Sequence, residues 1–217
     1  MLRHRVLPAD TSRMKVRALL VVVFVLGVAA PGTGVAAPPS DEVHVSAYDN
    51  GFYDLFDPSL VRLARGGTVT FDFDGPSSHT ATDGSGMDLY DSGVVPGGGP
   101  SFSYVFVAAG SYPVLCTLHP EMSANVFVPV GVWPPRGSPK DRFRVRWAAA
   151  VATPGSVYDV QSRRPDGAWR WWLRAVTSKT AIFRPDAGDG TYRFRARMRE
   201  PGAGTSGWSP TDTIRVR

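Results

Sequence analysis

Residues 110–122 read Gly-Ser-Tyr-Pro-Val-Leu-Cys-Thr-Leu-His-Pro-Glu-Met, and this stretch decides both the fold and the chemistry of the chain. It predicts a strand that leads into a short loop bearing a thiol, an imidazole and a thioether, at Cys116, His119 and Met122. A thiolate, two imidazoles and a long axial thioether form the ligand set of trigonal copper sites. The loop therefore predicts three ligands of a copper site and requires a second histidine from elsewhere.

Cys116 is the only cysteine of the chain, so no intrachain disulfide can form. In an exported protein a leftover thiol is reactive unless something occupies it. A buried free thiol and an intermolecular disulfide are the alternatives to a metal ligand. His119 and Met122 beside Cys116 favour the metal. Zinc also accepts cysteine and histidine, but a methionine as the fourth donor favours the softer copper ion.

Three histidines follow residue 37, namely His44, His79 and His119. His44 lies between two valines in an alternating segment, which predicts a position on the solvated face of a strand. His79 lies in an irregular segment rich in glycine, serine and aspartate. His79 is therefore the candidate for the missing imidazole.

Residues 1–37 resemble an export signal. Five basic side chains precede an apolar run over 18–30, and Val35-Ala36-Ala37 forms a small-residue cleavage site. The run is shorter than the roughly 20 residues of a membrane-spanning helix. We expect a secreted or cell-envelope protein. It would be held at the membrane only if this segment stays uncleaved.

Charge divides the remaining chain in two. Residues 38–135 carry two basic and eleven acidic side chains, whereas residues 136–217 carry seventeen basic and seven acidic ones. A change this abrupt indicates a domain boundary. Prolines and glycines around the change predict a short linker at 131–140, between domains at 38–130 and 141–217.

The first domain has the pattern of an all-β sandwich. Short alternating segments separated by glycine and proline predict strands near 43–45, 102–106, 112–116 and 125–130. Residues 60–73 read as two strands joined by a turn at Gly66-Gly67. The ligand loop lies between the last two of these strands, and His79 lies in the long irregular segment 75–100.

This domain resembles the cupredoxin superfamily of blue copper proteins, in its plastocyanin and amicyanin branch. The resemblance rests on the 110–122 motif, whose short ligand spacing is amicyanin-like, and on the 60–73 segment before the first histidine. It implies a Greek-key β-sandwich that binds one copper ion, alternating between Cu(II) and Cu(I). The implied metal ligands are His79, Cys116, His119 and Met122.

The sequence departs from this family at one position. Thr80 replaces the asparagine that usually follows the first histidine and ties the two ligand loops together. We expect Thr117, which follows the cysteine, to pair with Thr80 through the two hydroxyl groups. Hydrogen bonds around the sulfur tune the reduction potential, so this substitution bears on the potential. Met87 is a rival thioether, although packing of its loop is the simpler role.

The resemblance also implies a relay of single electrons and no turnover enzyme. The ring edge of His119 would be the electron port, inside an apolar collar that includes Leu118 and Pro120, and an unidentified redox protein would dock there. Glu121 would favour a cationic partner or would be an ordinary solvated side chain. One cysteine excludes a binuclear purple-copper centre, and three histidines exclude a trinuclear cluster. The alternative is a non-redox protein for copper handling or surface adhesion.

The second domain also reads as all-β. Residues 157–162 and 169–174 predict a hairpin around Pro165-Asp166-Gly167. Trp147, Trp169, the Gly207-Trp-Ser-Pro210 segment and Tyr192 at a tyrosine-corner position resemble a fibronectin type III domain. The resemblance implies a second β-sandwich, of the immunoglobulin and fibronectin kind.

Two rows of alternating arginines, at 142–146 and 193–199, make this domain basic. In the fibronectin-like fold the rows belong to opposite sheets, so they form no common groove and nucleic acid is not expected as a partner. An anionic polymer of the cell envelope, or the acidic copper domain itself, fits the charge better.

Overall fold

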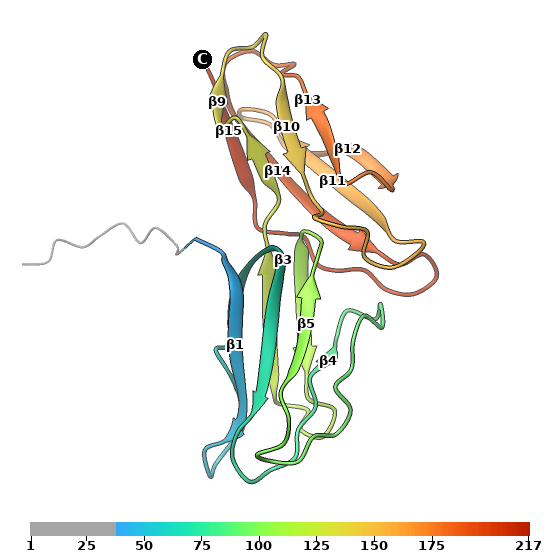
Figure 1. The fold of residues 1–217 in the computed structure, drawn as a ribbon. Helices are drawn as coiled ribbons and strands as arrows, with labels where there is room; N and C mark the ends of the chain where they lie inside the picture. Colours follow the sequence, from blue (N-terminus) through green and yellow to red (C-terminus); the bar gives the residue numbers. More distant parts are fainter. Residues whose placement is uncertain (1–37) are drawn as a thin grey trace, which may run out of the picture. The chain divides into compact units, whose positions relative to one another are not determined.

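The structure, a computed structural model, describes residues 38–217, and these residues form strands and no helix (Figure 1). None of the described segments is a helix that could cross a membrane. The prediction of an all-β chain is confirmed, whereas the predicted export signal lies outside the described residues.

The strands of the first half are β1 (Ser40–Asp49), β2 (Asp54–Asp57), β3 (Leu60–Phe73), β4 (Thr82–Asp83), β5 (Phe102–Phe106), β6 (Gly110–Leu115) and β7 (Ser123–Val128). Those of the second half are β8 (Gly131–Trp133), β9 (Arg136–Gly137), β10 (Phe143–Arg146), β11 (Val157–Arg163), β12 (Trp169–Val176), β13 (Thr180–Phe183), β14 (Gly190–Arg199) and β15 (Asp212–Val216).

In the first half, β3 belongs to two layers. Its first residues pair in parallel with β7, and its later residues pair with β1 and β5. The strand order is β2-β1-β3-β7-β6-β4, with β5 also bonded to β3. Alternate side chains of these strands point into a common core that contains Phe71, Phe106 and Tyr112. The ligand loop leaves this sandwich between β6 and β7.

The turn predicted at Gly66-Gly67 is wrong, because residues 60–73 form the single strand β3. Gly66 has φ +85°, and a Cβ on Gly67 would lie 2.8 Å from the carbonyl oxygen of Asp41. Glycine inside a strand often marks a bulge or a close backbone approach rather than a hairpin. Here the two glycines let one strand bend from one layer into the other.

The second half consists of a three-stranded sheet, β13-β10-β8, and a five-stranded sheet, β12-β11-β14-β15-β9. The hairpin predicted around residues 165–167 is confirmed, since β11 and β12 pair antiparallel. The hydroxyl group of Tyr192 donates to the carbonyl oxygen of Gly188 at 3.0 Å, which is the hydrogen bond expected of a tyrosine corner. The assignment to the fibronectin type III family stays a prediction.

The segment 131–140 differs from the expected linker. It contains β8 and β9, which pair with β10 and β15. Its prolines stand at Pro134, Pro135 and Pro139, outside these two short strands, so the backbone N–H groups needed for pairing remain. The described residues 38–217 belong to one compact unit. Reciprocal backbone hydrogen bonds between Ser111 and Gly207, of 2.8 and 3.0 Å, join its two halves.

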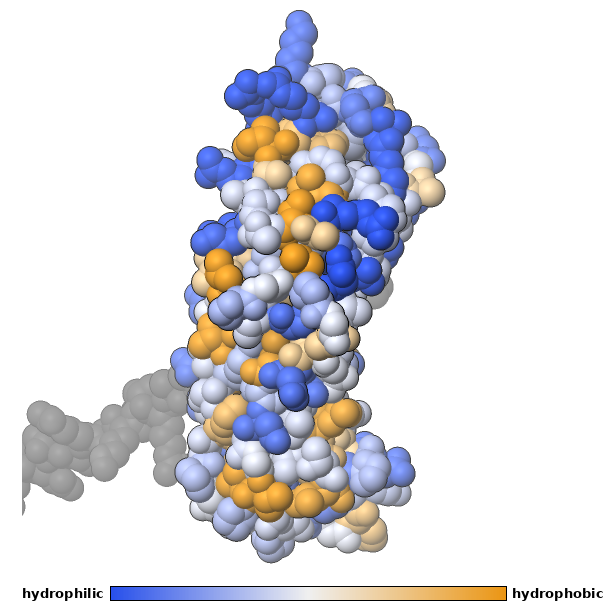
Figure 2. Space-filling model, turned by 90° about the vertical axis from the view of Figure 1, so that its right-hand side faces the viewer, coloured by the Kyte–Doolittle hydropathy of each residue, from blue (hydrophilic) through white to orange (hydrophobic). Residues whose placement is uncertain are grey.

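The two arginine rows lie on different sheets, as expected: β10 is in the three-stranded sheet and β14 in the five-stranded sheet. On β14 the guanidinium of Arg195 lies over the rings of Trp169 and Trp208, at 4.4 and 4.7 Å from the ring centroids, and Arg197 lies 4.8 Å from Trp208. Such cation–π contacts hold extended arginines in place on a sheet surface. Figure 2 shows hydrophilic residues (blue) gathered over this half, around smaller hydrophobic patches.

His44, which is not a proposed ligand, leads to a prediction about how the stability of the protein depends on pH. Its side chain is 62 % exposed, and its Nδ1 lies 2.7 Å from Asp72 Oδ2. The hydrogen bond with Asp72 raises the pKa of His44, and hydrogen bonds from Ser101 and His44 lower the pKa of Asp72. The contribution of His44 is therefore complete below about pH 6.5 and is lost as the pH rises through its folded-state pKa. That of Asp72 is present above about pH 4 and is lost on acidification.

We expect His44→Asn to flatten the fall in stability of the metal-free protein as the pH rises above about 6.5. Urea unfolding of both proteins at several pH values measures this. An identical pH slope in the two proteins would show that the His44–Asp72 pair does not contribute.

Candidate metal centre

The loop between β6 and β7 is closed by its own backbone. The N–H of Cys116 donates to the carbonyl oxygen of Met122 at 3.1 Å, and the N–H of Met122 donates to that of His119 at 2.9 Å. The last pair of the β6–β7 ladder, Leu115 with Ser123, lies directly below this closure. Two paired strands therefore fix the positions of all three loop residues.

His79 is held from the other side of the site. Its backbone N–H and carbonyl oxygen both bond to Val95, each at 2.9 Å, so an isolated bridge fixes one residue of the irregular segment. The His79 side chain has no exposed surface. The segment that sequence reasoning treated as irregular thus positions this imidazole as firmly as a strand would.

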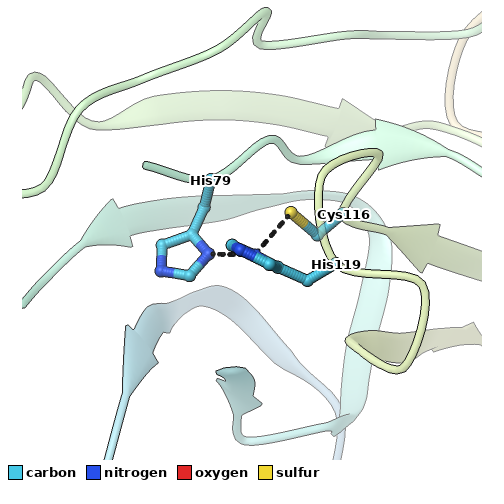
Figure 3. Close-up of side chains that lie close together, drawn as sticks. All are labelled: His79, Cys116 and His119. Atoms are coloured by element: carbon cyan, nitrogen blue, oxygen red, sulfur yellow. Dashed lines mark hydrogen bonds between the residues drawn. The ribbon is translucent and has the colours of Figure 1, made fainter. Parts of the chain in front are cut away.

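Three of the predicted ligands converge (Figure 3). The Nδ1 atoms of His79 and His119 are 3.2 Å apart, Cys116 Sγ is 3.5 Å from His119 Nδ1, and the three donor atoms all lie within 4.8 Å of one another. Ligands bound to one ion, with metal–nitrogen distances near 2.0 Å and metal–sulfur distances near 2.3 Å, must lie within about 4.3 Å of each other. Two of the three pairs satisfy this limit, and the third pair lies within 4.8 Å, so a closing movement of about 0.5 Å at most would bring all three donors onto one small metal ion.

The fourth predicted ligand, Met122, is buried at the end of the same loop, with 1 % of its surface exposed. The backbone hydrogen bond to Cys116 places the two residues side by side. Of the rival donors, His44 is on the exposed face of β1, and Met87 is buried in the hydrophobic core with 5 % of its surface exposed.

The two imidazoles differ in their surroundings. Burial, followed by the neighbouring His119, lowers the pKa of His79, so this ring stays neutral and keeps a lone pair available for a metal. The side chain of His119 is 29 % exposed. One ring is therefore enclosed by protein, and the other reaches solvent.

Thr80 connects the two ligand segments. Its backbone N–H donates to Cys116 Sγ at 3.4 Å, and its Oγ1 accepts a hydrogen bond of 2.8 Å from the N–H of Thr117. The two hydroxyl oxygens lie 3.2 Å apart. The predicted pairing of Thr80 with Thr117 is confirmed, and Thr80 takes the connecting role expected of an asparagine.

Thr80→Val is expected to lower the free energy of unfolding of the metal-free protein by about 1–2 kcal/mol, because the Thr117 N–H loses its acceptor. Thr80→Ser is the matched control, since it keeps the oxygen and removes only a methyl group. Urea unfolding measures both variants. Equal losses in the two variants would assign the effect to packing and not to the hydrogen bond.

Sequence reasoning missed the residues contributed by the start of β2. Asp54 Oδ1 lies 3.9 Å from His79 Nε2, and Asp54 Oδ2 lies 3.7 Å from His119 Nε2. Phe52 and Tyr53, just before it, are 88 % and 70 % exposed. Together with Leu118 and His119 they line a surface pocket of about 240 Å³. Asn50-Gly51 is a pair typical of turns, but nothing in the sequence shows that this turn lies beside the ligand loop.

Solved structures that are similar to this chain include the following three proteins. A purple cupredoxin from Nitrosopumilus maritimus is 24 % identical over 39 % of this chain and 97 % of that chain, with a TM-score of 0.35. A variant of amicyanin in its reduced Cu(I) form is 20 % identical over 39 % and 81 % of the two chains, with a TM-score of 0.34.

The third, a copper-containing nitrite reductase from Thermus scotoductus, is 25 % identical over 46 % of this chain and 24 % of that chain, with a TM-score of 0.31. No protein-family model matches the chain, and neither does any curated protein. Similarity of this extent does not assign the chain to a family.

Proposed function

We propose that this chain is an exported type 1 copper protein that carries single electrons, with His79, Cys116, His119 and Met122 as the metal ligands. The convergence of the Cys116 sulfur and the His119 imidazole with the imidazole of His79, which comes from a separate segment of the chain, carries the proposal. Copper bound there would supply a one-electron change between Cu(II) and Cu(I). The softness of thiolate and thioether donors favours copper over zinc.

The protein around the ligands suits electron transfer. Two bonded strands hold the loop, and the Val95 bridge holds His79, so the ligand positions change little with the charge of the bound ion. The Thr80 N–H donates to the sulfur and withdraws electron density from it. The exposed ring of His119 offers the route for an electron to and from the surface.

We propose that the redox partner docks over His119. Phe52, Tyr53 and Leu118 surround the exposed ring with apolar surface, and residues 38–135 are strongly acidic. An apolar patch within an acidic surface suits a partner that has an apolar contact area and basic residues around it.

The test is direct. Purified protein titrated with Cu(II) should take up one equivalent and become intensely blue through thiolate-to-metal charge transfer. Ascorbate should bleach the colour, and air or ferricyanide should restore it. Uptake without a strong visible band, or a colour that is lost irreversibly, would favour the non-redox role in copper handling or adhesion.

For the second half we propose an adapter role toward an anionic polymer of the cell envelope. The support is the excess of basic residues at 136–217 and the arginine row that the tryptophans hold on β14. Attraction between exposed charges is screened by salt. Binding to dextran sulfate should therefore weaken steadily as salt is added, and salt-independent binding would contradict the proposal.

A further inference from the structure

We propose that Asp54 is a positioning residue whose single carboxylate faces the outer nitrogens of both ligand imidazoles, orients the two rings and favours the divalent over the monovalent state of the metal. This inference rests on the proposed function, since it concerns the same site. It concerns a side chain on strand β2 that is not itself a ligand and that lies outside the two segments that carry the ligands.

The position of Asp54 is fixed by a tight turn. Asn50 Oδ1 accepts hydrogen bonds from the N–H groups of Phe52 and Tyr53, at 3.0 and 2.9 Å, and the Asn50 N–H donates to the Tyr53 carbonyl oxygen at 3.1 Å. Asp54 then pairs with Asp49 as the first residue of the β1–β2 ladder. The carboxylate is thus presented by a hairpin that packs against the site, and it does not hang from a mobile loop.

His79 Nε2 supplies the main argument. This atom is buried and has no hydrogen-bond partner among the described residues. When Nδ1 binds a metal, the neutral ring carries its proton on Nε2, so a buried N–H needs an acceptor. The carboxylate oxygen of Asp54 lies 3.9 Å away, and a movement of less than about 1 Å would bring it into hydrogen-bond range.

His119 presents the same atom to the same carboxylate. Its Nε2 lies 3.7 Å from Asp54 Oδ2, while Oδ1 faces His79. The two rings point their Nδ1 atoms at each other and their Nε2 atoms at Asp54. One carboxylate with two oxygens can therefore serve both rings, and it fixes the same tautomer in both.

Asp54 has no competing use in the described part of the chain. Its side chain is 28 % exposed and accepts no hydrogen bond from the described residues, and none of their lysines or arginines lies within ion-pair distance of it. A partly enclosed carboxylate costs solvation free energy. The two imidazole N–H groups and the positive metal behind them are the groups that can offset this cost.

The charge of Asp54 has a defined effect on the metal. Coulomb attraction scales with the charge of the ion, so the carboxylate stabilises a divalent ion about twice as much as a monovalent one. Removing this charge should therefore weaken binding of Zn(II) and Cu(II) more than binding of Cu(I). Loss of a mere structural contact would weaken all three ions alike and leave the reduction potential unchanged.

Asp54→Asn is the decisive variant, because it keeps the shape and one acceptor oxygen and removes the charge. We expect the Zn(II) affinity to fall about tenfold, as for other groups that orient metal-binding histidines, and the Cu(I) affinity to fall less. A tenfold loss in the affinity ratio of Cu(II) to Cu(I) corresponds to a rise of about 59 mV in the reduction potential. Competition titrations with chelators and redox titration measure these quantities.

Three variants complete the experiment. Asp41→Asn makes the same charge change at the far end of β1, roughly 26 Å along the strand from Asp49, and should leave the potential unchanged. Glu121→Gln removes an exposed charge from the ligand loop and should shift the potential much less than Asp54→Asn. Asp54→Glu should recover at least part of the wild-type potential.

The outcomes separate this inference from the proposed function. If the wild-type protein takes up no copper and shows no charge-transfer band, the proposed function fails. If the wild-type protein is blue but Asp54→Asn leaves the potential unchanged, lowers all affinities equally or matches Glu121→Gln, only the role of Asp54 is overturned.

Discussion

Cys116→Ser is expected to abolish the blue absorption of the Cu(II)-loaded protein and to weaken copper binding by more than about a hundredfold, a larger loss than changes outside the ligand set cause. The thiolate is the donor in the charge-transfer transition, and the soft sulfur is the strongest ligand for copper in this set. A serine hydroxyl is a hard donor that stays protonated near neutral pH. The two imidazoles and the thioether that remain form only a weak site.

This variant separates loss of the ligand from loss of the fold. Cys116 is 3 % exposed, and serine is nearly isosteric with it, so the metal-free variant should keep the circular dichroism spectrum of the wild type. Visible spectroscopy and a competition titration with a copper chelator measure the two expected losses. A blue Cys116→Ser protein would refute the proposed ligand set.

The second large effect is expected in the other half of the chain, where Trp147→Ala should lower the free energy of unfolding by about 4 kcal/mol. Trp147 has no exposed surface, and its ring meets that of Trp172 edge to face at 6.2 Å. Its Nε1–H donates to the carbonyl oxygen of Ser178 at 2.7 Å. Alanine would leave a large cavity and an unpaired carbonyl group in the centre of this sandwich.

Urea unfolding followed by circular dichroism measures this loss, and Trp133→Ala is its control. Trp133 is 70 % exposed, so its removal should change stability by no more than about 0.5 kcal/mol. The Trp147→Ala protein should still become blue with Cu(II) while it is folded, because all the proposed ligands belong to the first half. Equal destabilisation by the two substitutions would contradict the assigned core.

The sequence predicted that Cys116, His79 and His119 converge, because few residues of the chain can supply the thiolate and imidazole donors of a copper site. Only one cysteine exists, one histidine lies beside it in a loop between strands, and two other histidines remain after residue 37. The alternating pattern around His44 placed that residue on a solvated face, where the structure has it. The family resemblance led us to expect Thr80 and Thr117 to pair through their hydroxyl groups, and the two hydroxyl oxygens do lie 3.2 Å apart.

Predictions from short sequence patterns were wrong at two places where the chain continues in strands instead of forming a turn or a linker. Gly66-Gly67 has the composition of a hairpin turn, yet β3 continues through it, because the layers on either side need a strand that bends. Likewise, the proline-rich segment 131–140 was expected to be a linker and instead contributes two short strands. A two-residue pattern cannot show whether the segments beyond it pair with each other or with distant strands.

The sequence alone determined which candidate ligands exist, namely one thiol and three imidazoles after residue 37. It also determined the all-β pattern and the difference in charge between the two halves. Only the tertiary structure decided that Asp54 and its exposed aromatic neighbours lie beside the ligands. The ligands follow from the chemical type and spacing of residues, which are local properties. The surroundings of the proposed metal site depend on which strands pair across the sandwich, and the sequence of a strand does not show which distant strand it pairs with.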